Sequence, residues 1–174
     1  MSAETIRSLI RAVPDFPEPG VVFRDLTPLI ADPAGLRATV SALATAAPAP
    51  FDRVAGIEAR GFLFAAPLAH AVGSGVVLLR KAGKLPAATI GHDYALEYGA
   101  DRLEIHADAL VPGTRVLLVD DVLATGGTAE AAVRLIRLAG GEVTGALFVA
   151  AIEGLGGAAR LRAAGVEAVS LVSY

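Results

Sequence analysis

The chain has 174 residues, and its 18 acidic side chains outnumber its 15 basic ones, which gives a formal net charge of −3 at pH 7. Hydrophobic residues make up 54% and charged residues 19%, a composition that excludes an intrinsically disordered chain. The excess of acids argues against nucleic acid as the main partner, and the lack of cysteine excludes disulfides, thiol catalysis and cysteine-bound zinc. The length predicts a single domain over residues 1–174.

The first elements in chain order are predicted from apolar spacing and from proline. Apolar residues recur at helical spacing between Ile6 and Val13 and predict a helix over residues 3–13. The prolines that follow predict an irregular segment. A new helix begins at Asp32-Pro33, where the aspartate caps the helix and proline takes its first position. It is followed by a strand at residues 51–58, a helix at 61–72 and a strand at 76–80.

The uncharged stretch at residues 61–79 is close to the length that crosses a bilayer. Pro67, His70 and the turn at Gly73-Ser74-Gly75 interrupt it, so a buried helix, a turn and a buried strand explain it better. The first residues also lack the basic and apolar regions of a signal peptide. We therefore expect a cytoplasmic protein with no membrane partner.

The C-terminal half repeats the alternation of short apolar strands with helices. Such alternation predicts an α/β fold, a mostly parallel sheet flanked by helices on both faces. Residues 81–103 are the exception, because they are polar, contain glycine and show weak periodicity. A long insertion of this kind in a compact domain is usually a functional lid or a disordered segment. The remaining expected elements are strands at 115–119, 143–152 and 169–172 and helices at 129–136 and 157–164.

The strongest motif is VLLVDDVLATGGT at residues 116–128. Its apolar residues predict a buried strand, and Asp120 and Asp121 follow where open α/β sheets bind ligands. The glycines let backbone N–H groups approach an anion, and the next helix adds a positive N-terminus. Two carboxylates would repel a phosphate, so we expect them to face sugar hydroxyls or a metal-bound diphosphate. The predicted phosphate loop consists of Ala124, Thr125, Gly126, Gly127 and Thr128.

The motif is neither a P-loop nor a dinucleotide fingerprint. It resembles the 5-phosphoribosyl-1-pyrophosphate (PRPP) motif of type I phosphoribosyltransferases. This resemblance implies that Asp120 and Asp121 contact the ribose hydroxyls and that residues 124–128 hold the 5-phosphate. A plain strand, turn and helix with solvated acids is the alternative interpretation.

Other segments are similar to the adenine phosphoribosyltransferase family within that group. Residues 16–29 resemble its N-terminal signature and residues 56–62 its pyrophosphate loop, while residues 80–86 and 94–99 resemble its mobile catalytic loop. The resemblance covers nearly the whole chain. It implies a type I phosphoribosyltransferase-like core with a small N-terminal hood at about residues 1–30 and a mobile loop at about residues 81–103.

Cationic residues in these segments suit a diphosphate. Arg60 follows a strand, with Gly61 beside it, and a guanidinium there can clasp a diphosphate with two hydrogen bonds. Lys81 and Lys84 can deliver two cations to the leaving pyrophosphate, and in related enzymes a loop lysine reaches the neighbouring subunit's site. The resemblance also implies a cis peptide bond between Ala59 and Arg60. A surface arginine and solvated loop lysines are the plain alternatives.

The resemblance implies further roles at the base. Glu97 would approach the purine imidazole edge and act in catalysis with Arg60 and Lys84, and Tyr98 would help to close the lid. Three hood residues would pack over adenine, and Phe23 can stack on its ring. A solvated acid and a core phenylalanine are the alternatives. The expected hood residues are Val22, Phe23 and Arg24.

The implied reaction is transfer of the 5-phosphoribosyl group from PRPP to adenine, which gives AMP and pyrophosphate. Mg²⁺ would be carried by PRPP, and no metal site of the protein's own is expected because its histidines lack ligand-spaced partners. A homodimer with no nucleic-acid partner is also implied. Two alternatives remain: a phosphoribosyltransferase for a 6-oxopurine, and a regulator that senses PRPP without catalysis.

Overall fold

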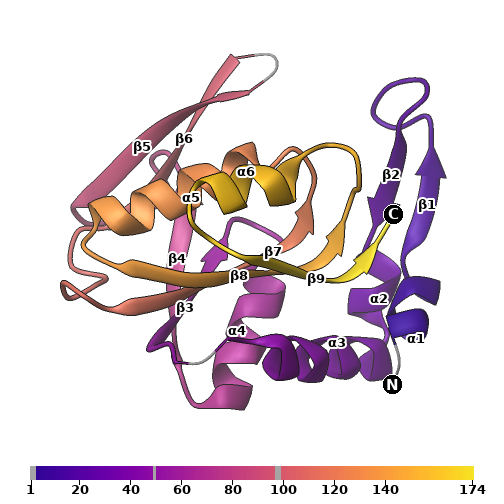
Figure 1. The fold of residues 1–174 in the computed structure, drawn as a ribbon, viewed down its shortest axis with the longest axis horizontal. Helices are drawn as coiled ribbons and strands as arrows, with labels where there is room; N and C mark the ends of the chain where they lie inside the picture. Colours follow the sequence, from indigo (N-terminus) through magenta and orange to yellow (C-terminus); the bar gives the residue numbers. More distant parts are fainter. Residues whose placement is uncertain (1–2, 49, 97–98) are drawn as a thin grey trace.

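The structure, a computed structural model, describes residues 3–48, 50–96 and 99–174. It confirms the predicted α/β class, with a seven-stranded sheet between two layers of helices (Figure 1). In spatial order the strands are β5 (Thr89–Leu96), β6 (Gly99–His106), β4 (Gly75–Lys81), β3 (Arg53–Ile57), β7 (Arg115–Leu123), β8 (Glu142–Ala151) and β9 (Ala168–Ser173). In this order the neighbouring strands from β4 onward pair in parallel, whereas the pairs β4–β6 and β6–β5 are antiparallel.

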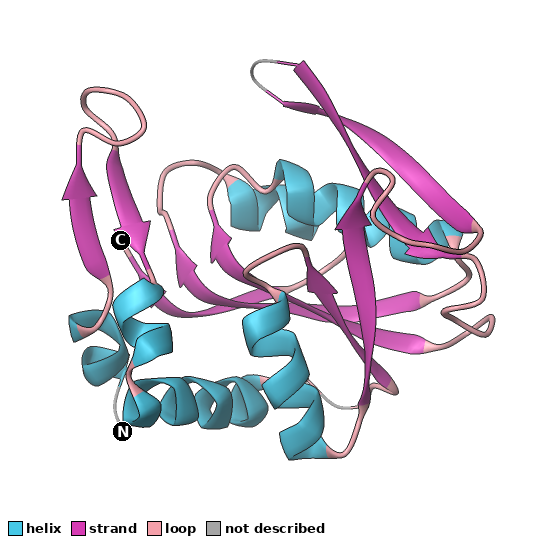
Figure 2. Cartoon of the chain, turned by 180° about the vertical axis from the view of Figure 1, so that it is seen from behind, coloured by secondary structure: helices cyan, strands magenta, loops and turns pink. Residues whose placement is uncertain are grey.

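Helices cover both faces of the sheet because the central strands are apolar on both sides. In β7, Val116 and Leu118 pack on the face that α5 covers, while Leu117 and Val119 pack on the face that α3 and α4 cover. Figures 1 and 2 show these two helix layers from opposite sides. The helices are α1 (Ala3–Ser8), α2 (Thr27–Ala31), α3 (Pro33–Ala46), α4 (Phe62–Val72), α5 (Gly127–Leu138) and α6 (Gly157–Ala163).

Helix α3 begins as the sequence predicts, because the Asp32 carboxylate accepts a hydrogen bond from the Gly35 amide at 2.6 Å and Pro33 takes the first position. The apolar stretch at residues 61–79 forms α4, a turn at Gly73 (φ 70°) and most of β4, also as predicted. Across the part of the chain that the structure describes, no helix is both long and apolar enough to cross a membrane.

The helix predicted over residues 3–13 is wrong beyond α1. Residues Arg11–Pro14 form strand β1, which pairs antiparallel with β2 (Val22–Asp25), so the segment expected to be irregular carries a hairpin. Ile6 and Ile10 are both buried. The apolar spacing therefore predicted correctly that these two side chains are buried. It did not predict that residues 11–14 pair with β2 as a strand instead of continuing the helix.

Residues 81–103, for which the sequence predicts no regular element, contain β5 and most of β6. Leu103 and Ile105 are fully buried and alternate with polar neighbours, which is the two-residue period of a strand. Tyr94 and Ile90 on β5 belong to the same core, which includes apolar residues of α5. The hairpin therefore extends the sheet and packs over α5.

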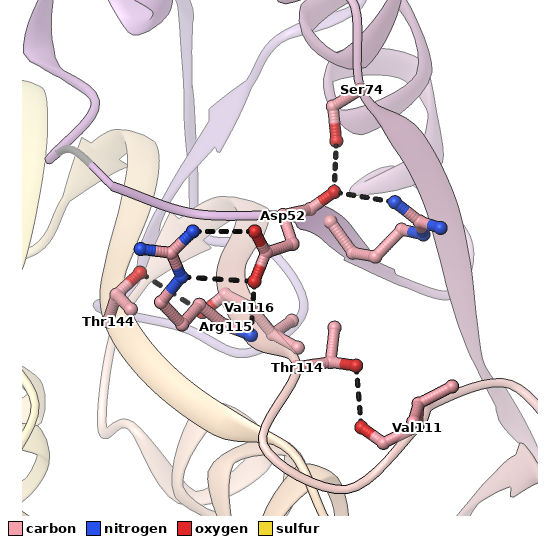
Figure 3. Close-up of polar contacts among 8 residues, drawn as sticks. Asp52, Ser74, Val111, Thr114, Arg115, Val116 and Thr144 are labelled. Carbon is pink, nitrogen blue, oxygen red and sulfur yellow. Dashed lines mark hydrogen bonds and ion pairs between the residues drawn. The ribbon is translucent and has the colours of Figure 1, made fainter.

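The amino ends of the central strands are tied together by Asp52 (Figure 3). Its carboxylate accepts hydrogen bonds from the Arg115 amide at 2.9 Å, from Nε at 3.0 Å and from Nη2 at 2.7 Å. The Ser74 hydroxyl donates to the Asp52 carbonyl at 3.1 Å. The hydrogen bonds from Arg115 lower the pKa of Asp52 from its ordinary 3.8 to about 2. The opposite, carboxyl end of the sheet is left open for the site.

Candidate active site

A cavity of about 520 Å³ lies at the carboxyl ends of β3, β4, β7 and β8, the edge where open α/β sheets bind ligands. One side is formed by the loop and helix start that follow β7, and the other by the hood strand β2. The lining residues are Val21, Val22, Phe23, Arg24, Ile57, Glu58, Ala59, Arg60, Lys81, Asp120, Asp121, Val122, Leu123, Ala124, Thr125, Gly126, Gly127, Thr128, Ala129, Ile152 and Leu155.

The conformation of the phosphate loop, residues 124–128, depends on Gly126 in the loop and on Gly157 at the start of α6. Gly126 has φ 78°, a left-handed conformation that favours glycine, and a Cβ there would lie 2.9 Å from the Cα of Gly157. A Cβ on Gly157, at the start of α6, would in turn collide with the Ala124 carbonyl oxygen. The loop therefore leans closely on α6. Since α5 begins at Gly127, its N-terminus and free N–H groups lie at the cavity, as a phosphate requires.

The two acids of the motif meet the pyrophosphate loop at the end of β7. Asp121, only 5% exposed, accepts a hydrogen bond from Arg60 Nε. The Asp121 amide donates to Asp120 Oδ1 at 2.9 Å. Burial, together with the negative charge of Asp121, raises the pKa of Asp120 well above its ordinary value. Partial burial, the largest single effect, disfavours the charge on Arg60, but its hydrogen bond to Asp121 and the nearby negative charges of Asp121 and Asp120 together outweigh burial, and the pKa of Arg60 is raised.

Gly61 allows the loop after β3 to approach the acids at the end of β7. A Cβ on Gly61 would lie 2.6 Å from the Ile57 carbonyl oxygen and 2.8 Å from Asp120 Oδ1, closer than side chains normally approach. The cis peptide expected between Ala59 and Arg60 is instead between Glu58 and Ala59, one residue earlier.

Glu58 is a site residue that the sequence analysis missed. Its carboxylate accepts hydrogen bonds from Arg80 Nε at 3.2 Å, from Arg80 Nη2 at 3.0 Å and from the Lys81 amide at 2.9 Å. These bonds, led by those of Arg80, lower the pKa of Glu58. Glu58 thus joins the ends of β3 and β4 at the cavity, which it lines. The available signal was an acid directly before Ala59-Arg60 inside the pyrophosphate loop.

The hood contributes an aromatic wall. Phe23 lines the cavity, with the Arg60 guanidinium 5.9 Å from its ring centroid and the Phe16 ring edge-on at 5.3 Å. Arg24, expected to pack over the base, also lines the cavity, and its guanidinium lies 3.9 Å from the centroid of the Tyr174 ring. Tyr174, which the sequence analysis also missed, thereby ties the hood to the end of β9.

The two expected loop lysines lie at different distances from the cavity. Lys81 lines the cavity, whereas Lys84 is exposed in the turn after β4 and is outside the lining described above. The Lys84 carbonyl accepts a hydrogen bond from Arg80 Nη1 at 2.9 Å. Glu97 and Tyr98 lie outside the described residues, so their roles stay predictions.

The acidic and histidine side chains of the described residues do not form a metal site by themselves. Within residues 3–48, 50–96 and 99–174, no group of three or more histidine, aspartate or glutamate side chains could hold a metal ion. Asp120 and Asp121 offer carboxylate oxygens at the cavity, and Mg²⁺ commonly takes one or two carboxylates together with substrate phosphates. The residues therefore fit a Mg²⁺ ion that is shared with a phosphorylated ligand.

Residues 37–158 match the family model of the phosphoribosyl transferase domain. Over 170 residues the chain is 54% identical to the adenine phosphoribosyltransferase of Parvibaculum lavamentivorans, with 97% of both chains covered. Among solved structures, the adenine phosphoribosyltransferase of Thermoanaerobacter pseudethanolicus matches with a TM-score of 0.95 and 45% identity, covering 99% of this chain and 100% of that one. The Saccharomyces cerevisiae enzyme, solved with an imino-altritol bisphosphate and adenine, matches with a TM-score of 0.90 and 35% identity, covering 97% of each.

Proposed function

Because the chain belongs to the adenine phosphoribosyltransferases, a branch of the phosphoribosyltransferase family, we propose that PRPP lies along the carboxyl edge of its sheet and that adenine lies beneath β2. The enzyme transfers the 5-phosphoribosyl group of PRPP to adenine and releases AMP and pyrophosphate, which is a purine-salvage reaction. One observation carries the proposed arrangement: the acids, the phosphate loop and the aromatic hood strand share a single cavity.

The 5-phosphate is assigned to the phosphate loop. The N-terminus of α5 points its free N–H groups there, and Thr125 and Thr128 supply hydroxyl donors. The ribose hydroxyls then reach Asp120 and Asp121 at the end of β7. A hydrogen bond to a charged group contributes roughly 1.5–3 kcal/mol, so this set anchors the sugar firmly.

The diphosphate is assigned to Arg60 and Lys81, which lie at the cavity beside Asp121 and Glu58. When the ribose hydroxyls take up Asp121, the Arg60 guanidinium is freed for a two-pronged contact with the diphosphate. Lys84 is a further proposed cation for the leaving pyrophosphate. Its support is its place in the turn after β4 and its electrostatic contribution to lowering the pKa of Glu58, to which Arg80 contributes most.

Adenine is assigned to the hood of about residues 1–30, where Val22 and Phe23 face the cavity. Stacking on Phe23 would orient the ring over the anomeric carbon. We assign Glu97 the role of accepting the proton that the imidazole edge of adenine loses as the glycosidic bond forms, and Tyr98 that of closing over the base. Support for these two roles is the resemblance of residues 94–99 to the family's mobile loop, proposed at about residues 81–103.

Displacement at the anomeric carbon should pass through an oxocarbenium-like state. The protein positions the two substrates, stabilises the charge that develops on pyrophosphate and excludes water. Bound to PRPP, Mg²⁺ supplies positive charge that makes the diphosphate a better leaving group. Arg60 and Lys81 add to that charge from the protein side.

We also infer a homodimer. Four large apolar side chains of α4 and β4 remain exposed in the single chain: Leu63 at 46%, Val72 at 39%, Val76 at 37% and Leu78 at 41%. Helix α4 packs against β4, so these side chains come from adjacent elements. A second copy is the occupant we assign to this surface. Analytical ultracentrifugation should give a dimer that Leu78→Glu weakens; a monomeric wild-type protein would refute it.

The reaction is tested by incubating the protein with PRPP, Mg²⁺ and adenine, hypoxanthine or guanine in turn, while nucleotide and pyrophosphate are measured. AMP from adenine alone is expected. IMP or GMP would favour the 6-oxopurine alternative, and thermal stabilisation by PRPP without product would favour a sensor. The proposed location is the cytoplasm, which the same assay on fractionated cells would test.

A further inference from the structure

The cavity cation Lys81 is held by side chains of the β5–β6 hairpin. Its Nζ donates to the Tyr94 hydroxyl at 2.9 Å and to the Asp101 carboxylate. The Tyr94 hydroxyl in turn donates to Asp101 Oδ2 at 3.1 Å. Tyr94 and Asp101 lie directly opposite each other in the paired strands. The hairpin therefore presents a ready-made binding site for the ammonium group.

Two properties keep Asp101 in place. Tyr94 is buried in the core that packs on α5, and the Arg102 amide donates to Asp101 Oδ1 at 2.7 Å. The hydrogen bond from Lys81 outweighs partial burial and lowers the pKa of Asp101. Partial burial opposes the charge on Lys81, but hydrogen bonds to Asp101 and Tyr94 outweigh it and raise the pKa of Lys81. The pair is therefore fully charged near neutral pH.

Asp101 differs from Asp121, the carboxylate that holds Arg60. Asp121 lines the cavity and has a ribose to bind, whereas Asp101 is outside the lining and contacts the lining residue Lys81. A diphosphate carries more negative charge than a carboxylate and competes for the same ammonium group. We propose that Asp101 is a positioning residue that competes with the diphosphate for Lys81 and so weakens the binding of pyrophosphate. This inference rests on the proposed placement of the diphosphate beside Lys81.

The hairpin need not detach when Lys81 turns to the ligand. The backbone of β6 pairs with β4 at Lys81 and Leu103, and the Gly83 amide donates to Glu104 Oε2 at 3.0 Å. Only the ammonium group has to move, and it leaves a carboxylate that is partly exposed to water. Partly exposed ion pairs of this kind shift an equilibrium by about fivefold at most. Asp101 thus tunes the affinity for pyrophosphate without blocking the site.

The test measures the Kd of pyrophosphate, with Mg²⁺ present, for the full chain and for Asp101→Asn. The variant should bind pyrophosphate about three- to fivefold more tightly, and its affinity for AMP should stay unchanged. Asp93→Asn is the matched control, because Asp93 accepts a hydrogen bond from Arg102 Nη1 at 2.9 Å on the same hairpin without touching Lys81. Tyr94→Phe should shift the affinity in the same direction by a smaller factor.

Lys81→Met distinguishes the placement of the diphosphate beside Lys81 from the competition by Asp101. It should weaken pyrophosphate binding and abolish the effect of Asp101→Asn in the double variant. Unchanged affinity in Lys81→Met would show that the diphosphate lies elsewhere, and the inference would fall with that placement. Weaker binding in Lys81→Met, combined with no gain in Asp101→Asn, would leave the placement intact and refute the competition alone.

Discussion

Arg60, in the loop after β3, donates a hydrogen bond from Nε to the carboxylate of Asp121 at the end of β7. The Asp121 side chain is 7% exposed and that of Arg60 is 53% exposed, so the pair spans the boundary between the core and the cavity. In the proposed arrangement each partner serves a different part of PRPP, Asp121 the ribose and Arg60 the diphosphate. Binding of PRPP therefore exchanges one ion pair for two sets of ligand contacts.

Asp121→Asn should lower kcat/KM for PRPP by about 10- to 100-fold, because it removes a charged acceptor worth roughly 1.5–3 kcal/mol. The fold should persist, since the half-exposed Arg60 can turn to water. Steady-state kinetics and circular dichroism check both parts. Unchanged turnover together with unchanged PRPP binding would remove Asp121 from the ribose site.

Gly157→Ala should raise KM for PRPP and lower Tm, although Gly157 is outside the cavity lining. The new methyl group would collide with the Ala124 carbonyl and push on the phosphate loop, and overpacking of this kind costs about 1–3 kcal/mol. Gly75→Ala is the control, because its Cβ would meet only the flexible Arg53 side chain, at 3.3 Å. Equal KM values in the two variants would show that α6 does not position the loop.

Tyr174→Ala should raise KM for adenine more than KM for PRPP. Its ring contacts the guanidinium groups of Arg24 at 3.9 Å and Arg7 at 4.9 Å, and each such contact is worth about 0.5–2 kcal/mol. Loss of both loosens the hood, which contains α1 and β2, and should weaken adenine binding several-fold. Tyr174→Phe keeps a ring and should stay near wild type. An unchanged KM for adenine in Tyr174→Ala would show that the contacts of Tyr174 do not support the adenine site.

Acid should weaken the tie between Asp52 and Arg115. Its hydrogen bonds with Arg115 hold the pKa of folded Asp52 at about 2, below its ordinary 3.8, so its stabilisation is present above about pH 4 and is lost as pH falls towards 2. Asp52→Asn should therefore lower Tm at neutral pH, and this difference should shrink between pH 4 and pH 2. Thermal melts of both proteins across that range test it; a difference that stays constant would assign the effect to packing.

The features predicted best from sequence are those encoded by local chemistry. The strand, paired acids and glycine loop of residues 116–128 occur together in sequence, and the structure buries the strand in the core and brings the acids and the loop to the cavity. The cap at Asp32 is local in the same way. The parallel α/β architecture followed from the alternation of apolar strands and helices.

The features that were missed depend on contacts between distant segments. The stacking of Arg24 on Tyr174 joins residues far apart in the chain, and β1 forms only because β2 is there to pair with it. In the β5–β6 hairpin, charged residues such as Arg102 and Glu104 separate the buried Leu103 and Ile105, and this polar composition obscured a strand pattern. No rule based on neighbouring residues alone identifies such partners.

A crystal structure of the enzyme with bound AMP is the most direct test of where the substrates bind. In that structure the 5-phosphate should accept hydrogen bonds from the phosphate loop, the ribose hydroxyls should lie within hydrogen-bond distance of Asp120 and Asp121, and the Phe23 ring should face adenine. An AMP molecule whose phosphate lies away from residues 124–128, or whose base lies away from β2, would contradict the proposed arrangement.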